Sequence, residues 1–415
     1  MEDEAGDRLV IPPRTTLAHP AFVHAMVWLL VLGLFNLRLT SLLLPLNAAT
    51  LNLVLSSVAA GIAIGLLGYA LLPKLRPHSV VRETRELEQL YRWRQWALTI
   101  WAVCSVGEIA VARGLPIVWL VTGDTSRDYR NFGIPTIHGL LTALFLFSVA
   151  ATAVEIFVHG RRRQLRLLLP LLVWLVLQVN RGALIWSFCQ VAGVFLLARQ
   201  LRIRTVALVT AAVLAGVLLF GVIGDARSGQ SGGAGVRSVV PDDGGVLVER
   251  LPSGFLWVYL YTTTPLNNIV RAIGTFEPGG SVYFSVAALL PTVIRQLVFT
   301  DPDRKYPVGL VNEAFNTSTW FASFLADFGP AGAVGCTAVL QLIAMLFYRP
   351  ARVWRPWALV GFSACFQAIA LSVFADTFTS LVSVAQLAIA LALQAAAGAQ
   401  ASAQAVLSPP DSMTQ

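Results

Sequence analysis

The sequence predicts an all-α polytopic membrane protein with about ten transmembrane helices and one long loop on the outer side. Of its 415 residues, 56% are hydrophobic and only 13% are charged, whereas about a quarter of the residues of a soluble globular protein are charged. Several apolar runs approach the roughly 20 residues that a helix needs to cross ~30 Å of hydrocarbon. Because lipid offers the backbone no hydrogen-bond partners, these runs are expected to be helices.

Ten apolar segments are the expected spans: residues 21–35, 51–72, 96–112, 134–158, 167–179, 182–198, 205–223, 328–347, 357–374 and 379–397. They divide the chain into a tail (1–20), seven spans (21–223), a long loop (224–327), three spans (328–397) and a second tail (398–415). Segment 281–299 is also apolar, but it contains Pro291 and Arg295. Counting it as a span would turn the arginine-rich loop 349–356 outward, so we expect a re-entrant or interfacial helix instead.

Charge sets the expected orientation. In the ten-span scheme, loops 73–94, 159–166, 199–204 and 349–356 lie on one side and hold sixteen Lys or Arg residues. Cytoplasmic loops retain positive charge, so both termini are predicted to be cytoplasmic and the long loop to lie outside. These loops and anionic lipid headgroups explain the formal charge of +8, which therefore predicts no nucleic-acid partner. The four cysteines lie in apolar spans without close spacing, and no nucleotide motif occurs, so neither a metal nor a cofactor is expected.

Polar residues near the outer ends of the spans are the candidate site, because polar groups are costly there unless they face a cavity or water. Arg181 follows Asn180 between two apolar runs and is either a polar-pocket residue or an interfacial anchor. In segment 255–273, Pro265 is expected to break or start a helix and to leave Asn267 and Asn268 free for hydroxyl groups. Arg271 would share a helix face with Asn267. Together with Arg295 on segment 281–299, these arginines suggest an anion site, although each alone could be structural.

Segment 312–332 passes from polar residues into the eighth span, and it contributes Glu313, Asn316, Thr319 and Asp327. Asp327 is either the N-cap of that span or an outer carboxylate that could deprotonate a hydroxyl group. Glu313 and Asp124 are the other carboxylates considered for this role. The threonines 262–264, Asn267, Asn268, Asn316 and Thr319 are expected to contact sugar hydroxyls, and Tyr261 and Trp257 to stack on sugar faces.

Four motifs, in order, resemble the Wzy-type polymerases of lipid-linked oligosaccharide repeat units, which are relatives of the O-antigen ligases. They are Gly114–Pro116 with Gly123-Asp124, Tyr129 and Gly133–Pro135; Asn180-Arg181-Gly182; Tyr261–Arg271 with Pro265 and Asn268; and Asn316 through Asp327-Phe328-Gly329 and Gly332. The resemblance covers residues from about Gly114 to Gly335. It is short and degenerate, as is typical of this family.

The resemblance implies a GT-C-like glycosyltransferase of the bacterial inner membrane, with its active site facing the periplasm. Its donor and acceptor would be glycans linked to undecaprenyl diphosphate, destined for O-antigen or exopolysaccharide. Arg181, Arg271 and Arg295 would stabilise the lipid-pyrophosphate leaving group. A chain-length co-polymerase is the partner that the family implies.

Three other functions stay open at this point. An O-antigen ligase usually has a histidine where this chain has Asn316-Thr-Ser-Thr319, which favours a polymerase. A lipid-linked oligosaccharide flippase or transporter predicts internal repeats and mid-membrane polar residues, of which Glu108 in the third span is the main example. A non-catalytic scaffold would not need three outer arginines next to amide groups.

Overall fold

The computed structural model describes residues 16–71, 80–124, 126–127, 132–198, 250–273, 279–301, 310–312 and 315–407, together with short stretches between 207 and 237. Every regular element in these ranges is a helix, so the predicted all-α fold is confirmed for the described part of the chain. Five helical segments are long and apolar enough to cross a membrane: 48–71, 85–122, 137–157, 321–351 and 381–399. The chain is therefore a helical membrane protein, and the total of ten spans stays a prediction.

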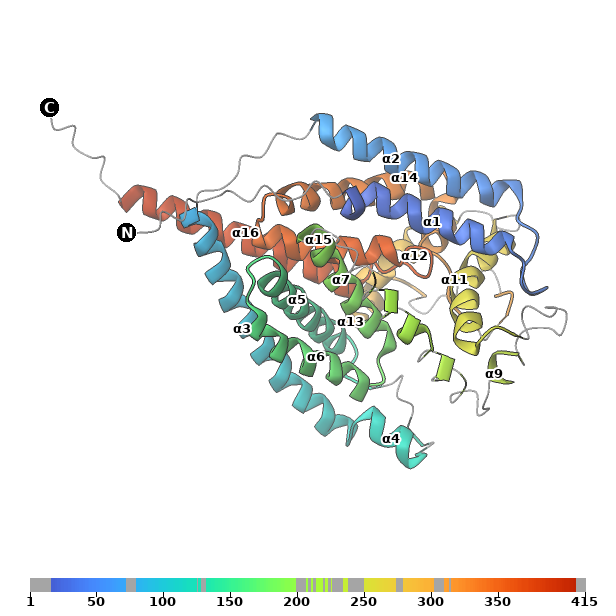
Figure 1. Cartoon of the computed structure of the whole chain (residues 1–415), viewed down its shortest axis with the longest axis horizontal. Coiled ribbons are helices and arrows are strands. Elements are labelled where there is room, and N and C mark those ends of the chain that lie inside the picture. The colour runs from blue at the N-terminus through green and yellow to red at the C-terminus, as the bar shows by residue number, and fades with distance from the viewer. Residues whose placement is uncertain are drawn as a thin grey trace.

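The helices form a bundle of two groups that meet at α15 (Figure 1). In the first group, α1 (Pro20–Asn36), α2 (Ala48–Leu71) and α14 (Phe321–Ala351) pack together. The second group contains α3 (Val80–Ala112), α5 (Ile137–Phe157), α6 (Leu165–Leu177) and α7 (Arg181–Ala198). Helix α15 (Pro356–Ala370) packs against α14, α7 and α16 (Leu381–Leu407). Expected span 205–223 falls largely outside the described residues.

Short elements complete the described chain: η1 (Thr16–Ala18), α4 (Pro116–Thr122), η3 (Arg162–Gln164), α9 (Ala234–Arg237), α11 (Ser253–Ala272), α12 (Tyr283–Val286), η4 (Ala287–Leu289) and α13 (Thr292–Val298). Figure 1 shows α4, α9 and α11 at the end of the bundle opposite to the last turns of α16. We call this end the α11 end. Helices α1, α3, α6 and α15 finish there, and α2, α5, α7, α14 and α16 begin there.

Segment 281–299 forms no continuous span. It is divided into α12, η4 and α13, with Leu290 and Pro291 in extended conformation before α13. Seven residues of helix rise only about 10 Å, too little to cross the hydrocarbon. Helix α13 exposes Val293, Ile294, Leu297 and Val298, as an interfacial helix would, and its depth in the bilayer stays a prediction.

Two helices begin earlier than the apolar pattern predicts. Helix α14 was expected to begin at residue 328, but it begins at Phe321 and passes through a break at Gly329, whose φ is 70°. Glycine adopts this conformation without steric cost, and Pro330 cannot donate the hydrogen bond that would close the turn. Helix α3 was expected from residue 96, but it begins at Val80 because its polar first half buries charged side chains in ion pairs.

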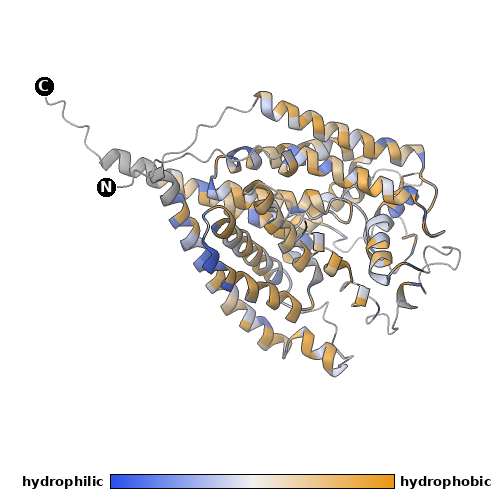
Figure 2. Ribbon diagram, viewed as in Figure 1, coloured by the Kyte–Doolittle hydropathy of each residue, from blue (hydrophilic) through white to orange (hydrophobic). Residues whose placement is uncertain are grey.

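Those ion pairs lie at the end opposite to α11. Arg94 and Glu155 are 1% and 0% exposed, and their charged groups are 2.7 Å apart. Arg355 pairs with Glu86 at 2.9 Å, and Arg349 donates to the carbonyl oxygen of Gly68. Figure 2 shows this hydrophilic first half of α3 beside helices that are apolar over most of their length. The described residues therefore place a paired basic cluster at this end, as the charge pattern predicts for loops on one side.

The buried pair of Arg94 and Glu155 gives a test of the packing between α3 and α5. Replacing one partner leaves an uncompensated buried charge, so Glu155→Leu should lower the free energy of unfolding by about 3–5 kcal/mol. The double variant Arg94→Met/Glu155→Leu should recover most of that loss. Thermal unfolding in detergent measures both. Asp124→Asn, which removes an exposed ion pair, is the control and should change stability by less than about 0.5 kcal/mol. Equal losses in the single and double variants would contradict this prediction.

His19 gives a test of pH dependence. Its Nδ1 accepts a hydrogen bond from the Ala21 backbone N–H and caps α1. Burial, and then the charge of Arg352, lower its pKa from 6.5 to about 4. The stability due to neutral His19 is therefore present above pH 6.5 and is lost as the pH falls towards 4. His19→Asn keeps a capping oxygen but does not titrate, so its melting temperature should fall less steeply over this window than that of the wild type. Parallel curves would refute this role.

Candidate functional site

Helix α11 anchors the loops at its end of the bundle. The Asn267 side chain is 0% exposed; its oxygen accepts from the Leu44 N–H at 2.8 Å and its nitrogen donates to the Leu42 carbonyl at 2.9 Å. Next to it, Asn268 donates to the carbonyls of Phe315 and Thr317 and accepts from the Val311 N–H. Asn267 thus holds the connection between α1 and α2, and Asn268 holds the segment before α14.

These contacts correct two expectations. Pro265 neither breaks nor starts a helix, since α11 continues from Ser253 to Ala272. A proline inside a helix removes one backbone hydrogen bond and destabilises the helix by about 3 kcal/mol or more. The packing of α11 offsets this cost. The threonines 262–264 donate to carbonyls four residues earlier in the same helix. The side chains of the three threonines and both asparagines therefore form hydrogen bonds within the protein. These bonds do not support direct contacts with sugar hydroxyls.

Tyr261 lies in an aromatic cluster of three elements. Its ring centroid is 6.0 Å from that of Trp257, 5.7 Å from Phe315 and 6.0 Å from Phe374. Trp257 in turn donates its Nε1–H to Asp225 at 3.0 Å. Tyr261 itself stays half-buried. The cluster joins α11 to the segment before α14 and to the turn between α15 and α16.

Arg271 and Asn316 are the exposed residues of this neighbourhood. The Arg271 guanidinium donates to the Leu310 carbonyl oxygen at 2.8 Å, which places the cation at the edge of the anchored segment 310–317. Asn316 lies in that segment, between the two carbonyls that Asn268 binds. Both side chains are exposed, unlike the buried amides of Asn267 and Asn268.

Asp327 has a structural role in this fold. It is 1% exposed, and its carboxylate accepts from the N–H groups of Phe284 and Ser285 at 3.2 and 2.7 Å and from the Ser285 hydroxyl. A further bond comes from the Ser281 hydroxyl. Asp327 therefore caps α12, and it does not cap the second part of α14, which begins after the break at Gly329. Because this carboxylate is buried and its oxygens already bind four donors, they cannot reach the hydroxyl group of a ligand, so we leave Asp327 out of the proposed catalytic groups.

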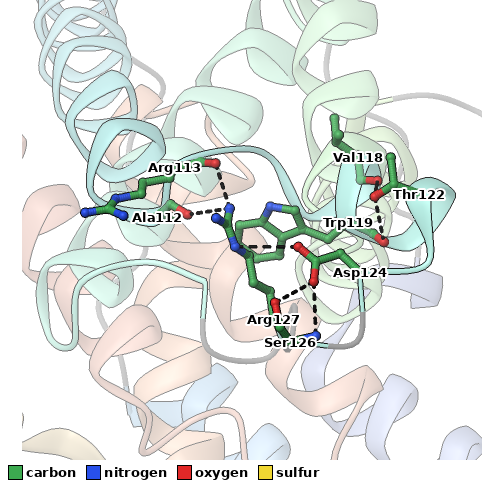
Figure 3. Close-up of polar contacts among 8 residues, drawn as sticks. All are labelled: Ala112, Arg113, Val118, Trp119, Thr122, Asp124, Ser126 and Arg127. Carbon is green, nitrogen blue, oxygen red and sulfur yellow. Dashed lines mark hydrogen bonds and ion pairs between the residues drawn. The ribbon is translucent and has the colours of Figure 1, made fainter.

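Three other expected site residues have local contacts. Asp124 accepts from Ser126 and pairs with Arg127, which also donates to the Arg113 carbonyl at 2.7 Å (Figure 3). The hydrogen bonds from Ser126, with the Arg127 charge, hold the pKa of Asp124 below its usual value, which makes it a weak base. Asn180 caps α7 by accepting from the Ala183 N–H, and Thr319 accepts from the Phe321 N–H.

The remaining expected site residues are Arg181, Arg295 and Glu313. Arg181 is the first residue of α7 at the α11 end, but its side chain lies outside the described part. Glu313 also lies outside it. Arg295 lies on the half-buried side of α13, which the Thr292 N–H fastens to the Thr136 hydroxyl at 3.0 Å. The structure thus brings Tyr261, Asn268, Arg271 and Asn316 to one neighbourhood, and it joins α13, which carries Arg295, to the residue before α5.

One half-buried carboxylate at this end was not singled out from the sequence. Asp376 lies in the turn between α15 and α16, and it accepts from the N–H groups of Phe378 and Thr379 and from the Thr379 hydroxyl. Burial raises its pKa. The available signal was an acid followed three residues later by threonine, directly after an apolar span, which is typical of a side-chain capped turn.

The described residues contain no group of three or more His, Cys, Asp or Glu side chains that could hold a metal ion. At the α11 end the described side chains include the exposed guanidinium group of Arg271 and the aromatic cluster around Tyr261. Such a set suits a phosphorylated or diphosphorylated ligand that also carries sugar rings.

No protein-family model, curated protein or solved structure matches this chain.

The anchoring role of Asn268 can be tested directly. In Asn268→Asp, a carboxylate replaces the amide that donates two hydrogen bonds, and it faces two carbonyl oxygens. The free energy that holds the segment before α14 should fall by about 1–3 kcal/mol. Hydrogen exchange should then become at least tenfold faster at the Val311 N–H and in segment 315–317. Asn316→Asp, with the same change on an exposed side chain, is the matched control. Unchanged exchange in Asn268→Asp would show that other contacts hold the segment.

Proposed function

We propose that this protein is a membrane glycosyltransferase that polymerises oligosaccharide repeat units linked to undecaprenyl diphosphate, at the periplasmic face of a bacterial inner membrane. The observation that supports it most is the arrangement around α11. One helix holds two loops with buried amides, contributes the half-buried Tyr261, and presents the exposed Arg271 at the carbonyl oxygen of Leu310, six residues before the exposed Asn316. The anchored loops can hold a cation in one position while the helices around it contact lipid.

The reaction requires this combination. A hydroxyl group of one lipid-linked repeat attacks the anomeric carbon of a lipid-linked glycan chain, and the lipid pyrophosphate leaves with the bonding electrons. Negative charge develops on the leaving oxygen, so a preorganised guanidinium stabilises the transition state more than the ground state. Arg271 is the described residue best placed for this, and Arg181 and Arg295 are further candidates at the same end. Tyr261 offers an aromatic face to a sugar ring.

The lipid nature of both substrates fits the fold. A donor and an acceptor with polyprenyl tails stay in the bilayer, so their headgroups reach the protein at the ends of its helices. Helix α13, which one hydrogen bond joins to the residue before α5, exposes four apolar side chains that suit contact with such tails at the headgroup layer.

Glycan analysis in a host strain that lacks the gene tests this function. Wild-type protein should restore long polymer, whereas Arg271→Ala at equal expression should lower its amount by roughly 10²-fold and leave single repeat units on the surface. Arg271→Lys should restore part of the activity, because it keeps the charge but not the planar guanidinium. Arg250→Ala, at another exposed arginine of the same long loop, is the control and should behave as wild type.

The other outcomes separate the alternatives. Loss of all surface glycan in the deletion strain, single units included, would indicate ligation or export instead of polymerisation. Polymer of normal length from Arg271→Ala would remove Arg271 from the site.

A further inference from the structure

A buried carboxylate and a histidine form a pair at the α11 end that the assigned roles above do not use. Glu108 lies in the last turns of α3 and is 1% exposed, and His138 is the second residue of α5 and is 27% exposed. Glu108 Oε2 lies 3.1 Å from His138 Nδ1, and Oε1 accepts from the Ile134 N–H at 3.0 Å. Among the described residues, no arginine or lysine forms an ion pair with Glu108.

The choice of partner distinguishes this pair from the structural one at the other end. Glu155 is paired with arginines, which stay charged at all physiological pH values. Glu108 is paired with histidine, the side chain that most readily gains and loses a proton near neutral pH. A buried carboxylate in an apolar helix is costly. An arginine partner would stabilise it more than a histidine does, because arginine keeps its charge. The histidine therefore suggests a role other than stability.

Glu108 also determines which nitrogen of His138 can act as a base. An ionised carboxylate only accepts hydrogen bonds, so Nδ1 must carry the proton and Nε2 presents its lone pair. The Nδ1 edge is closed: a Cβ atom built on Gly133, whose φ is 99°, would lie 2.5 Å from Nδ1. Phe132 meets the ring edge-on at a centroid distance of 5.9 Å. Nε2 has no hydrogen-bond partner among the described residues and is not buried.

The segment that carries His138 is joined to α13, which carries the candidate leaving-group residue Arg295. Thr136, two residues before His138, accepts the hydrogen bond from Thr292 at the start of α13, and Arg295 follows three residues later in that helix. Thr136 has a φ of 71°, which is strained for a β-branched residue and typical of positions held for function. One hydrogen bond therefore joins the element that presents His138 to the element that carries Arg295.

We propose that His138 is the general base of the polymerisation reaction and that Glu108 is its positioning residue. This inference rests on the proposed function. Nε2 takes the proton of the acceptor hydroxyl as that oxygen bonds to the anomeric carbon, and the bond from this carbon to the pyrophosphate oxygen breaks with its electron pair leaving on the lipid pyrophosphate. The proton passes from His138 to water, which restores the base.

Purified protein in lipid nanodiscs, supplied with a lipid-diphosphate-linked repeat unit isolated from the deletion strain, gives the test. Polymer formed per minute is measured at varied substrate concentration. His138→Ala should lower kcat by roughly 10² to 10⁴-fold. Added imidazole should raise the rate of this variant at least tenfold, because it acts as a replacement base. Glu108→Gln can donate a hydrogen bond to Nδ1 and so favours the wrong tautomer, and it should lower kcat at least tenfold with little change in KM.

Two controls accompany these variants. His19→Asn, at a histidine of the opposite end, should keep wild-type activity, and thermal unfolding should show that His138→Ala is folded. Wild-type polymer with an unchanged rate for His138→Ala would overturn the base role alone. A folded but inactive His138→Ala that imidazole does not rescue would make His138 structural and overturn it too. If wild-type protein forms no polymer, the proposed function fails and the base role falls with it.

Discussion

The need to satisfy backbone polar groups where little water reaches them shapes the α11 end of this molecule. The helices satisfy their own N–H and C=O groups, but the connections between them cannot. Asn267 and Asn268 supply the missing partners: each binds the backbone of a different connection, and both lie on one helix. Asp327 does the same for α12, and Asp376 for the turn before α16. Four side chains thus hold the irregular segments on which any site at this end must be built.

The two ends of the bundle meet this need with different chemistry. At the end opposite to α11, charged pairs such as Arg94 with Glu155 and Arg355 with Glu86 join helices directly. At the α11 end, the anchors are neutral amides and carboxylates that bind backbone N–H groups. Cations there stay at the surface, as Arg271 does beside Leu310. The described ion pairs between helices therefore lie mainly at one end, and at the other end backbone hydrogen bonds to amides and carboxylates hold the connections.

The same constraint explains why residues that look like ligands became anchors. Asparagine, threonine and aspartate bind sugars for the reason that they bind backbone, since each offers short polar groups of fixed geometry. Their chemistry alone cannot separate the two uses. Burial separates them: Asn267 and Asp327 are buried, whereas Asn316 is exposed to solvent. The Glu108–His138 pair stands between these cases, with a buried carboxylate and an accessible ring nitrogen.

The sequence by itself determined that this is a helical membrane protein, since apolar runs of about 20 residues have no other stable form in lipid. It also indicated that segment 281–299 is not a simple span and that basic residues gather at one end. The tertiary structure decided what each polar residue does. Pro265 stays inside α11, Asp327 caps α12 and α14 begins at Phe321, because packing and hydrogen bonds between distant segments outweigh local preferences. The contact of Glu108 with His138 joins residues 30 positions apart, and no local pattern could reveal it.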